Sequence, residues 1–225
     1  MSDRLSSHTN PAELSIGYPL STSIYSSTPK RIFDVLISVL LLPILLPIIG
    51  ILYVIVRSSG GPGFFGHTRI GRDGVEFKCW KVRTMVTDAQ ERLDVLLASD
   101  PAALVEWERD RKLRNDPRLT RLGEFLRKSS LDELPQIFNV MKGEMSLVGP
   151  RPVTAPELEK YGARKSVYLA MRPGVTGLWQ VSGRNDVSYA RRVALDSAYH
   201  NSVSLGMDLS ILYKTGNAVL KRTGV

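Results

Sequence analysis

The chain has 225 residues, of which 43% are hydrophobic, enough for one domain of ordinary size with a buried core, so a disordered or fibrous protein is excluded. Thirty Lys and Arg residues against 22 Asp and Glu residues give a net charge of +8, which favours anionic partners such as nucleic acid, a phospholipid surface or a phosphorylated substrate. One cysteine, Cys79, excludes an internal disulfide, and three scattered histidines do not suggest a His-rich metal site.

Residues 1–29 are predicted to form a disordered tail, because they contain eleven Ser or Thr residues and three prolines and show no apolar periodicity. A membrane-embedded segment is predicted over residues 30–58, where an uncharged run extends for 22 residues from Val35 to Val56. A secretory signal is disfavoured because the run is too long and no small-residue cleavage site follows it. A buried core helix of a soluble protein is also disfavoured, since such helices seldom run this far without a charge.

Two prolines bear on how this segment meets the membrane. A straight helix of its length would extend about 33 Å, enough to cross a bilayer. Pro47 removes a helical hydrogen bond in mid-run and Pro43 adds a second weak point, which predicts a helix-break-helix with halves too short to cross. Lys30, Arg31 and Arg57 flank the run, and the positive-inside rule prefers both of its ends on the cytoplasmic face. A re-entrant hairpin is therefore favoured, with a spanning helix as the alternative.

Residues 59–225 are predicted to form one mostly helical α+β domain that contains a small β-hairpin. Strands are expected at 64–70 and 75–85, on either side of the turn Gly71-Arg72-Asp73-Gly74. Thr87 and Gln90 have the spacing of a capping box, which predicts a helix from there to about Ala98. Apolar spacing and breaking residues predict further helices over 102–113, 119–128, 132–140, 156–170, 187–202 and 205–220, the last amphipathic enough to lie on a bilayer or on the core.

A carboxylate pair, Asp132-Glu133, comes directly after a basic stretch at 109–128, in which eight basic residues face three acidic ones. Pro135 is tolerated only in the first turn of a helix, so Asp132 is predicted at a helix N-terminus. There the free N–H groups and Arg127 would help to bind a diphosphate. The plainer alternative is that Asp132 only caps the helix and Glu133 is an ordinary first-turn acid.

Two later loops offer candidate ligand contacts. Arg151 lies between two prolines, in a rigid mount for a bidentate phosphate contact or in a stiff turn with a solvated side chain. Trp179 lies in a glycine-punctuated loop, available to stack on a ligand that Gln180 or Arg184 would hydrogen-bond. A buried core anchor is the commoner role for such a tryptophan.

Lys81 and Arg83 are two residues apart on a predicted strand, so their side chains are expected on the same face. An exposed strand face usually carries such a pair without any function. Lining a cleft for the diphosphate is the sharper alternative.

Six segments together form a specific pattern that none of them carries alone: KRIFD at 30–34, KVRTM at 81–85, NDPRLTRLG at 115–123, RKSSLDELPQ at 127–136, SLVGPRP at 146–152 and PGVTGLWQVSGR at 173–184. With these motifs, the chain from Lys30 to about Thr215 resembles the bacterial sugar transferase family, the monotopic polyprenyl-phosphate phosphoglycosyl transferases. It looks like the short form of that family. Its resemblance is to undecaprenyl-phosphate galactose phosphotransferases that initiate exopolysaccharide assembly.

The resemblance implies that Asp132 and Glu133 are a catalytic dyad. In the family, the Asp attacks the β-phosphorus of a UDP-sugar, UMP leaves, and polyprenyl phosphate resolves the sugar-phosphoryl-aspartate. Mg²⁺ is implied as cofactor, bridging Glu133 or the neighbouring Asp132 and the diphosphate. Arg127 and Arg151 match the phosphate binders.

Gln180 and Arg184 match the nucleotide-sugar side of the family's site. The resemblance also implies a re-entrant membrane helix, in agreement with the prolines. One departure concerns its break: many relatives have a Ser-Pro pair, whereas Leu46 precedes Pro47 here, so no Ser hydroxyl can satisfy the freed carbonyls. Pro43 is therefore expected to share the break.

The resulting hypothesis is an enzyme at the cytoplasmic face of the bacterial inner membrane. It would move a hexose 1-phosphate, galactose or glucose, from a UDP-sugar to undecaprenyl phosphate, as the first step of exopolysaccharide biosynthesis. One alternative moves only the sugar and releases UDP, and another is a basic membrane-anchored scaffold. Nucleic-acid binding is disfavoured, because no recognised binding motif accompanies the basic residues. The hexose and the oligomeric state, a homodimer included, are left open.

Overall fold

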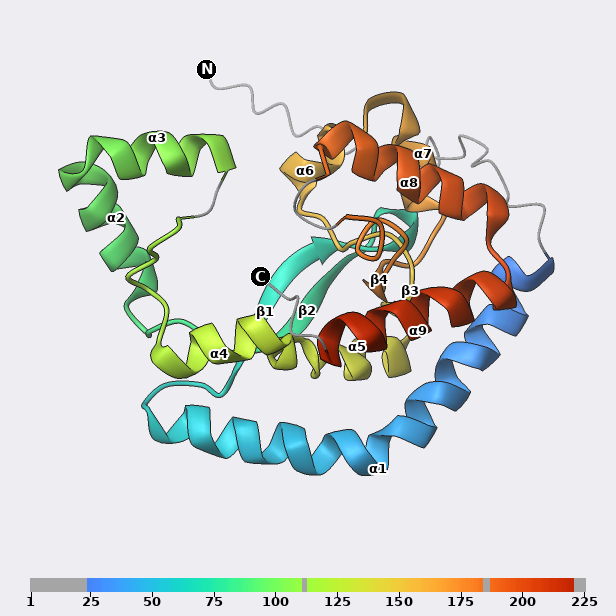
Figure 1. Cartoon of the computed structure of the whole chain (residues 1–225), viewed down its shortest axis with the longest axis horizontal. Coiled ribbons are helices and arrows are strands. Elements are labelled where there is room, and N and C mark those ends of the chain that lie inside the picture. The colour runs from blue at the N-terminus through green and yellow to red at the C-terminus, as the bar shows by residue number, and fades with distance from the viewer. Residues whose placement is uncertain (1–23, 111–112, 184–186, 221–225) are drawn as a thin grey trace, which may run out of the picture.

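The computed structural model describes residues 24–110, 113–183 and 187–220 (Figure 1). Helices dominate it, so the expected mostly helical α+β fold with a small β-hairpin is confirmed. The tail predicted at 1–29 falls largely outside the described residues. The elements are α1 (Thr28–Ser58), β1 (Phe64–Ile70), β2 (Glu76–Val82), α2 (Ala89–Ser99), α3 (Pro101–Asp110), α4 (Arg121–Ser129), α5 (Gln136–Lys142), β3 (Ser146–Val148), α6 (Ala155–Glu159), α7 (Lys165–Leu169), β4 (Gly174–Thr176), α8 (Tyr189–Ser202) and α9 (Leu205–Leu220).

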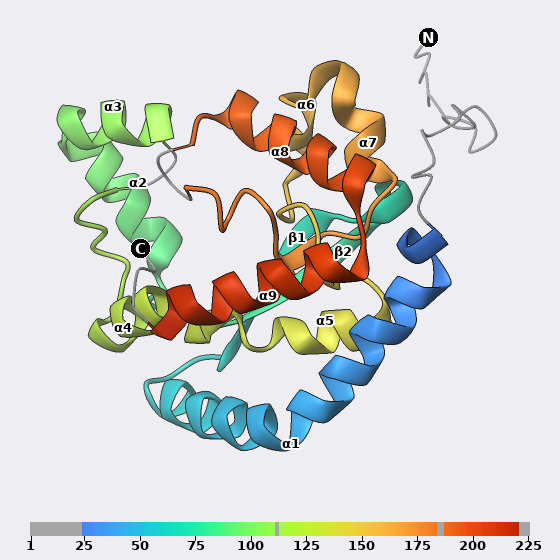
Figure 2. The ribbon, with the colours of Figure 1, turned by 45° about the vertical axis from the view of Figure 1, so that its right-hand side comes forward.

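Helix α1 is a single helix of 31 residues that contains both Pro43 and Pro47. The predicted break is instead a bend, because helical backbone continues on both sides of each proline (Figures 1 and 2). One side of α1 packs on the domain, where Ile49 and Val56 are buried. The other side exposes many aliphatic side chains, with Leu40 71% exposed. Its length, its composition and this exposed apolar surface indicate association with a membrane.

Three contacts tie the first turns of α1 to the rest of the molecule. Lys30 Nζ lies 2.6 Å from the buried carboxylate of Asp208 on α9. Arg31 donates to two carbonyls at the C-terminal end of α5, at 2.6 and 2.9 Å. Asp34 accepts a hydrogen bond from the backbone N–H of Leu147 in β3. The two cations that precede the apolar run, Lys30 and Arg31, therefore have partners inside the protein, a role that charge patterning did not indicate.

The predicted β-hairpin is confirmed, with β1 and β2 antiparallel in a register from Phe64 opposite Val82 to Ile70 opposite Glu76. Asp73 adopts φ 57° in the turn, a left-handed conformation that Asp tolerates better than most residues. The second strand ends at Val82, earlier than expected, and beyond it Met85 forms a bridge with Leu119, just before α4.

The helices predicted after Thr87 and over 156–170 differ from the structure. The capping box at Thr87 is not formed, because α2 begins at Ala89 with Asp88 at its N-cap and no side-chain cap bond. The single helix expected over 156–170 is two short helices, α6 and α7, separated by Gly162 with φ 53°. The helix expected over 205–220 is α9, with the same bounds.

Strands β3 and β4 form a short parallel pair that local sequence patterns did not predict. Ser146 lies opposite Gly174 in this pair. Their backbones approach so closely that a Cβ atom on Gly174 would collide with the backbone nitrogen of Gly149. This close approach joins the two loops that carry Arg151 and Trp179. The core surrounds the pair and includes Val140, Met145, Val148, Tyr199 and Ile211.

Candidate active site

The Asp132-Glu133 pair lies in a short 3₁₀ turn, Leu131–Glu133, and not in the first turn of α5. Ser130 has a left-handed φ of 58° and ends α4, and Pro135 is the N-cap of α5. The predicted helix over 132–140 is thus wrong in its start. The proline ring would clash with the carbonyl four residues earlier, so an α-helix cannot continue upstream through it. The pair therefore sits between two helices, on a tight connection.

Lys81 is the cation nearest to the dyad. Its Nζ lies 2.7 Å from Glu133 Oε1 and 3.8 Å from Asp132 Oδ2. The Asp132 side chain is buried, whereas that of Glu133 is 28% exposed. One ammonium group thus holds both carboxylates at the edge of β2.

The two carboxyl groups have different proton affinities. Burial raises the pKa of Asp132 to about 6, although the charge of Lys81 opposes this shift. Burial also disfavours the charged form of Glu133, but the charge and hydrogen bond of Lys81 outweigh it, so that the pKa of Glu133 is lowered. At neutral pH both groups are ionised, and Asp132 is the more basic and hence the better electron-pair donor.

Arg127 lies on α4, behind Asp132. Its Nε donates to Thr84 Oγ1 at 3.0 Å, and its positive charge lowers the pKa of Asp132. The sequence-based expectation that Arg127 belongs with the dyad is consistent with this placement. Its binding of phosphate stays a prediction.

Arg151 and Trp179 meet beside the β3–β4 pair. The guanidinium carbon of Arg151 lies 5.9 Å from the centroid of the Trp179 ring, and its charge reaches Glu133. Trp179 is 4% exposed, so it is buried in the core, the commoner of the two roles expected for it. Its ring also contacts the guanidinium of Arg151. Gln180, next in the chain, donates to the carbonyl of Val175 at 3.3 Å. Arg184 lies outside the described residues.

Arg83 does not join Lys81 at the dyad. Its guanidinium donates to the carbonyls of Val56 and Gly60 and to the hydroxyl of Ser59, all at the C-terminal end of α1. The expectation that both cations line one cleft is therefore not met. The strand ends at Val82, so alternation of side chains does not extend to Arg83.

Arg69 was not among the site residues predicted from the sequence. This residue lies on the same face of the hairpin as Lys81, binds Glu157 at 2.8 Å, and lowers the pKa of Glu133 through its charge. The predicted hairpin could have indicated it. Pairing the two strands around the turn and following alternate residues from Lys81 places Arg69 on the same face.

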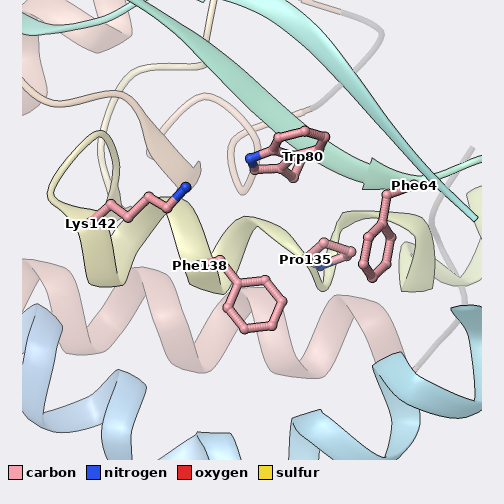
Figure 3. Close-up of a pocket in the computed structure, with 5 residues that line it drawn as sticks. All are labelled: Phe64, Trp80, Pro135, Phe138 and Lys142. Carbon is pink, nitrogen blue, oxygen red and sulfur yellow. The ribbon is translucent and has the colours of Figure 1, made fainter.

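An apolar pocket lies on the other face of the hairpin, where Trp80 and Lys81 point in opposite directions. Its volume is about 270 Å³, and Pro135, two residues after the dyad, forms part of its wall. Figure 3 shows rings from β1, β2 and α5 around it. The lining residues are Phe64, Trp80, Pro135, Phe138 and Lys142. The charged site and the apolar pocket thus share the segment that carries the dyad.

The dyad is also the candidate site for a divalent cation. Among the residues that the structure describes, no three His, Cys, Asp or Glu side chains are grouped to hold a metal. Asp132 and Glu133 supply two hard oxygen donors. Mg²⁺ is commonly held by one or two carboxylates together with substrate phosphates, and this donor set fits that mode of binding.

The comparisons with known proteins decide the family. A family model described as bacterial sugar transferase matches residues 25–222. The chain belongs to the bacterial sugar transferase family. This sugar transferase chain is 54% identical over 195 residues to an undecaprenyl-phosphate galactose phosphotransferase of Salmonella typhimurium, covering 87% of the chain and 41% of that relative. It is 53% identical to the exopolysaccharide production protein ExoY of Sinorhizobium fredii, covering 87% of each.

A more distant relative is the UDP-glucose:undecaprenyl-phosphate glucose-1-phosphate transferase of Klebsiella pneumoniae, 35% identical over 83% of the chain and 39% of that relative. The sugar transferase chain thus spans about two fifths of the length of some relatives, and nearly nine tenths of the ExoY proteins. All of the candidate site residues lie within the region that the family model matches.

Proposed function

We propose that this sugar transferase moves a hexose 1-phosphate, galactose or glucose, from a UDP-sugar to undecaprenyl phosphate and so begins exopolysaccharide synthesis. The observation that carries the proposal is Asp132, a buried carboxylate with a raised pKa, held within reach of Lys81 and backed by Arg127. Relatives named for galactose and glucose phosphotransfer support the substrate class. The reaction takes place at the cytoplasmic face of the inner membrane in this proposal.

The reaction needs two displacements at one phosphorus atom. A carboxylate oxygen of Asp132 bonds to the β-phosphorus of the UDP-sugar, and the bond from that phosphorus to the bridging oxygen breaks, so that UMP leaves with the electron pair. A phosphate oxygen of undecaprenyl phosphate then bonds to the same phosphorus. The acyl phosphate bond breaks, Asp132 is regenerated as a carboxylate, and undecaprenyl diphosphate-hexose is the product.

The surrounding charges make the first displacement feasible. An anionic nucleophile and an anionic diphosphate repel each other, and Lys81, Arg127 and Arg151 offset that repulsion. Glu133 fixes the ammonium group of Lys81 beside Asp132 through its 2.7 Å bond. The short 3₁₀ turn presents both carboxylates without a flexible linker.

Mg²⁺ is part of the proposal. Glu133 or Asp132 would hold it together with substrate phosphates, and its charge would further neutralise the diphosphate.

The apolar surfaces support a lipid acceptor. The pocket between the hairpin and α5 begins two residues from Glu133, and α1 packs against α5 on that side. We propose that α1 enters and leaves the same leaflet, with its bend near Pro43 and Pro47, so that the site faces the membrane surface where the phosphate of a long prenyl lipid is found.

The nucleotide that is released tests the function. Purified protein is incubated with undecaprenyl phosphate, Mg²⁺ and UDP-galactose or UDP-glucose, and the nucleotide is identified. UMP is expected. UDP would show transfer of the sugar alone, and neither nucleotide, with no label in lipid, would favour a membrane-anchored scaffold.

A matched pair of variants tests the nucleophile. Asp132→Asn is expected to lower turnover by about 10³-fold or more, since Asn cannot form the acyl phosphate. Asp94→Asn, on the exposed face of α2, is expected to keep full turnover. Near-normal release of UMP by Asp132→Asn would remove Asp132 as the attacking group.

A further inference from the structure

Two arginines from distant parts of the chain lie on one tryptophan. Arg192, on α8, places its guanidinium carbon 4.5 Å from the centroid of the Trp179 ring, and Arg151 lies 5.9 Å from the same centroid. Trp179 is itself buried, so the ring is a fixed support. Cation–π contacts of this kind hold a guanidinium in place while its N–H edges remain available.

The charges around this pair leave it short of negative partners. In the described part of the chain, neither Arg151 nor Arg192 has a carboxylate within ion-pair distance, and Arg192 Nε donates only to the carbonyl of Val187, at 3.3 Å. Glu157 interacts electrostatically with both arginines, but it binds Arg69 and accepts from both the N–H and the hydroxyl of Thr154. Asp196, which also feels the charge of Arg192, accepts a hydrogen bond from Tyr161.

Two like charges on one tryptophan ring repel each other. The charge of Arg151 is among the causes that lower the pKa of Arg192. A bound anion would relieve this repulsion. Two guanidinium forks on one support match the oxygens of a phosphate group.

The location of the pair favours a water-soluble anion. Figures 1 and 2 both show α8 on the opposite side of the molecule from α1, the membrane-associated helix. Arg151 also lies within electrostatic range of the dyad, because its charge is among the causes that lower the pKa of Glu133. A diphosphate whose β-phosphorus lies at Asp132 would therefore extend its other phosphate toward these arginines.

We propose that Arg192 and Arg151, supported by Trp179, form the binding site for the nucleotide phosphate, that is, the α-phosphate of the UDP-sugar and the phosphate of UMP. This inference rests on the proposed function and adds to it a residue on α8 that lies outside every motif singled out in the sequence. The other source of the same chemistry is the phosphate of the lipid carrier. The experiment below separates the two.

Binding of UDP to the full-length protein in detergent, measured by calorimetry, is the first test. Arg192→Gln is expected to weaken binding by about 10-fold to 100-fold, the range for charge-assisted hydrogen bonds. Arg191→Gln is the matched control, because Arg191 is the preceding residue on α8 and is exposed, and it is expected to bind as wild type does. Arg192→Lys, which keeps the charge and loses the fork, is expected to fall between them, and it serves as the test variant if Arg192→Gln does not fold.

Equal binding of UDP by wild type and Arg192→Gln would overturn the inference while leaving the proposed function intact. If the wild-type protein does not bind UDP and releases no UMP, the proposed function itself would be overturned. Steady-state kinetics separate the two phosphates: Arg192→Gln is expected to raise KM for the UDP-sugar and leave KM for undecaprenyl phosphate unchanged. The reverse pattern would assign the arginines to the lipid phosphate and contradict the inference.

Discussion

At the scale of single residues, the candidate site depends on how burial and charge divide two adjacent carboxyl groups. Asp132 is buried and titrates near pH 6, while Glu133, bonded to Lys81, is ionised well below that. Adjacent acids in an extended or helical peptide would titrate almost alike. The tertiary environment makes one of them a strong electron-pair donor and the other a fixed anion.

Asp132 is expected to lower the stability of the protein at neutral pH. Its folded pKa of about 6 lies above the ordinary aspartate value of 3.8, so the folded state binds more protons between these values and loses stability as pH rises through that window. Asp132→Asn should remove this penalty and stabilise the inactive protein by on the order of 1–3 kcal/mol at pH 7.5. Thermal unfolding in detergent measures the difference in stability between the variant and the wild type. This difference should be smaller at pH 5 than at pH 7.5. A variant less stable than wild type at pH 7.5 would contradict the prediction.

Lys81 is expected to determine the pH below which the rate of the first displacement falls, that is, the acid limb of its pH–rate profile. That step requires ionised Asp132, so its rate should fall below about pH 6. Lys81→Met removes a charge that lowers the pKa of Asp132, so the limb should move to higher pH, whereas Lys81→Arg should hold it near the wild-type position. Single-turnover UMP release without undecaprenyl phosphate excludes titration of the lipid.

Lys78→Met is the control, because Lys78 lies on the opposite face of β2 from Lys81. This variant should leave the acid limb of the pH–rate profile at the wild-type pH. An acid limb that does not respond to loss of the Lys81 charge would show that another group titrates in the first step.

At the scale of elements, α1 is held to the domain by a buried ion pair. The Asp208 side chain is fully buried and accepts from Lys30 at 2.6 Å, from Tyr25 at 2.9 Å and from Tyr199 at 2.6 Å. This network connects the first turn of α1 with α9, far apart in sequence. It fixes where the membrane helix leaves the domain and hence where the site lies relative to it.

Lys30→Met is expected to destabilise the protein by about 3–5 kcal/mol, because it leaves the Asp208 carboxylate buried without its cation. Adding Asp208→Asn should recover part of the loss, since the remaining group is then neutral. Thermal unfolding of the single and double variants gives the coupling. The exposed pair Lys165–Glu159, at 2.6 Å, is the control, and Lys165→Met should change stability by less than about 1 kcal/mol. Equal effects of the two lysine variants would show that burial of the pair is not decisive.

At the scale of the whole molecule, polar and apolar surfaces are separated. Arg192 lies on α8, on the opposite side of the molecule from α1, and exposed aliphatic side chains lie along α1 (Figure 1). In the proposed function, this separation lets a soluble nucleotide-sugar and a membrane lipid approach the same dyad from two directions. The bend of α1 decides whether both ends of that helix share one side of the membrane.

Cysteine labelling in intact cells tests the proposed re-entrant topology. Ser27→Cys, at the start of α1, is expected to stay unlabelled by an impermeant maleimide from outside and to react after permeabilisation, as Ser99→Cys on α2 should. The native Cys79 is buried and gives little background. Labelling of Ser27→Cys from outside would establish a spanning helix. A continuous helix of 31 residues, about 46 Å long, is long enough for that outcome if it straightens.

The sequence by itself determined the long apolar segment, the hairpin, the bounds of α9 and the adjacency of Asp132 and Glu133. These features follow from local periodicity, turn chemistry and covalent adjacency, which require no knowledge of distant contacts. The 3₁₀ turn of the dyad could be predicted only in part. Pro135 indicates a helix boundary, but it does not specify the backbone conformation of the residues before it.

Only the tertiary structure decided which distant groups meet. Arg83 donates to backbone at the end of α1, and Lys30 pairs with Asp208. The glycines next to the β3–β4 pair allow the backbones of two loops to come into contact. Arg192 reached Trp179 in the same way, from a helix with no recognisable motif. Such pairings depend on long-range packing, in which a side chain takes whichever partner the assembled core places within its reach, and no local pattern specifies that partner.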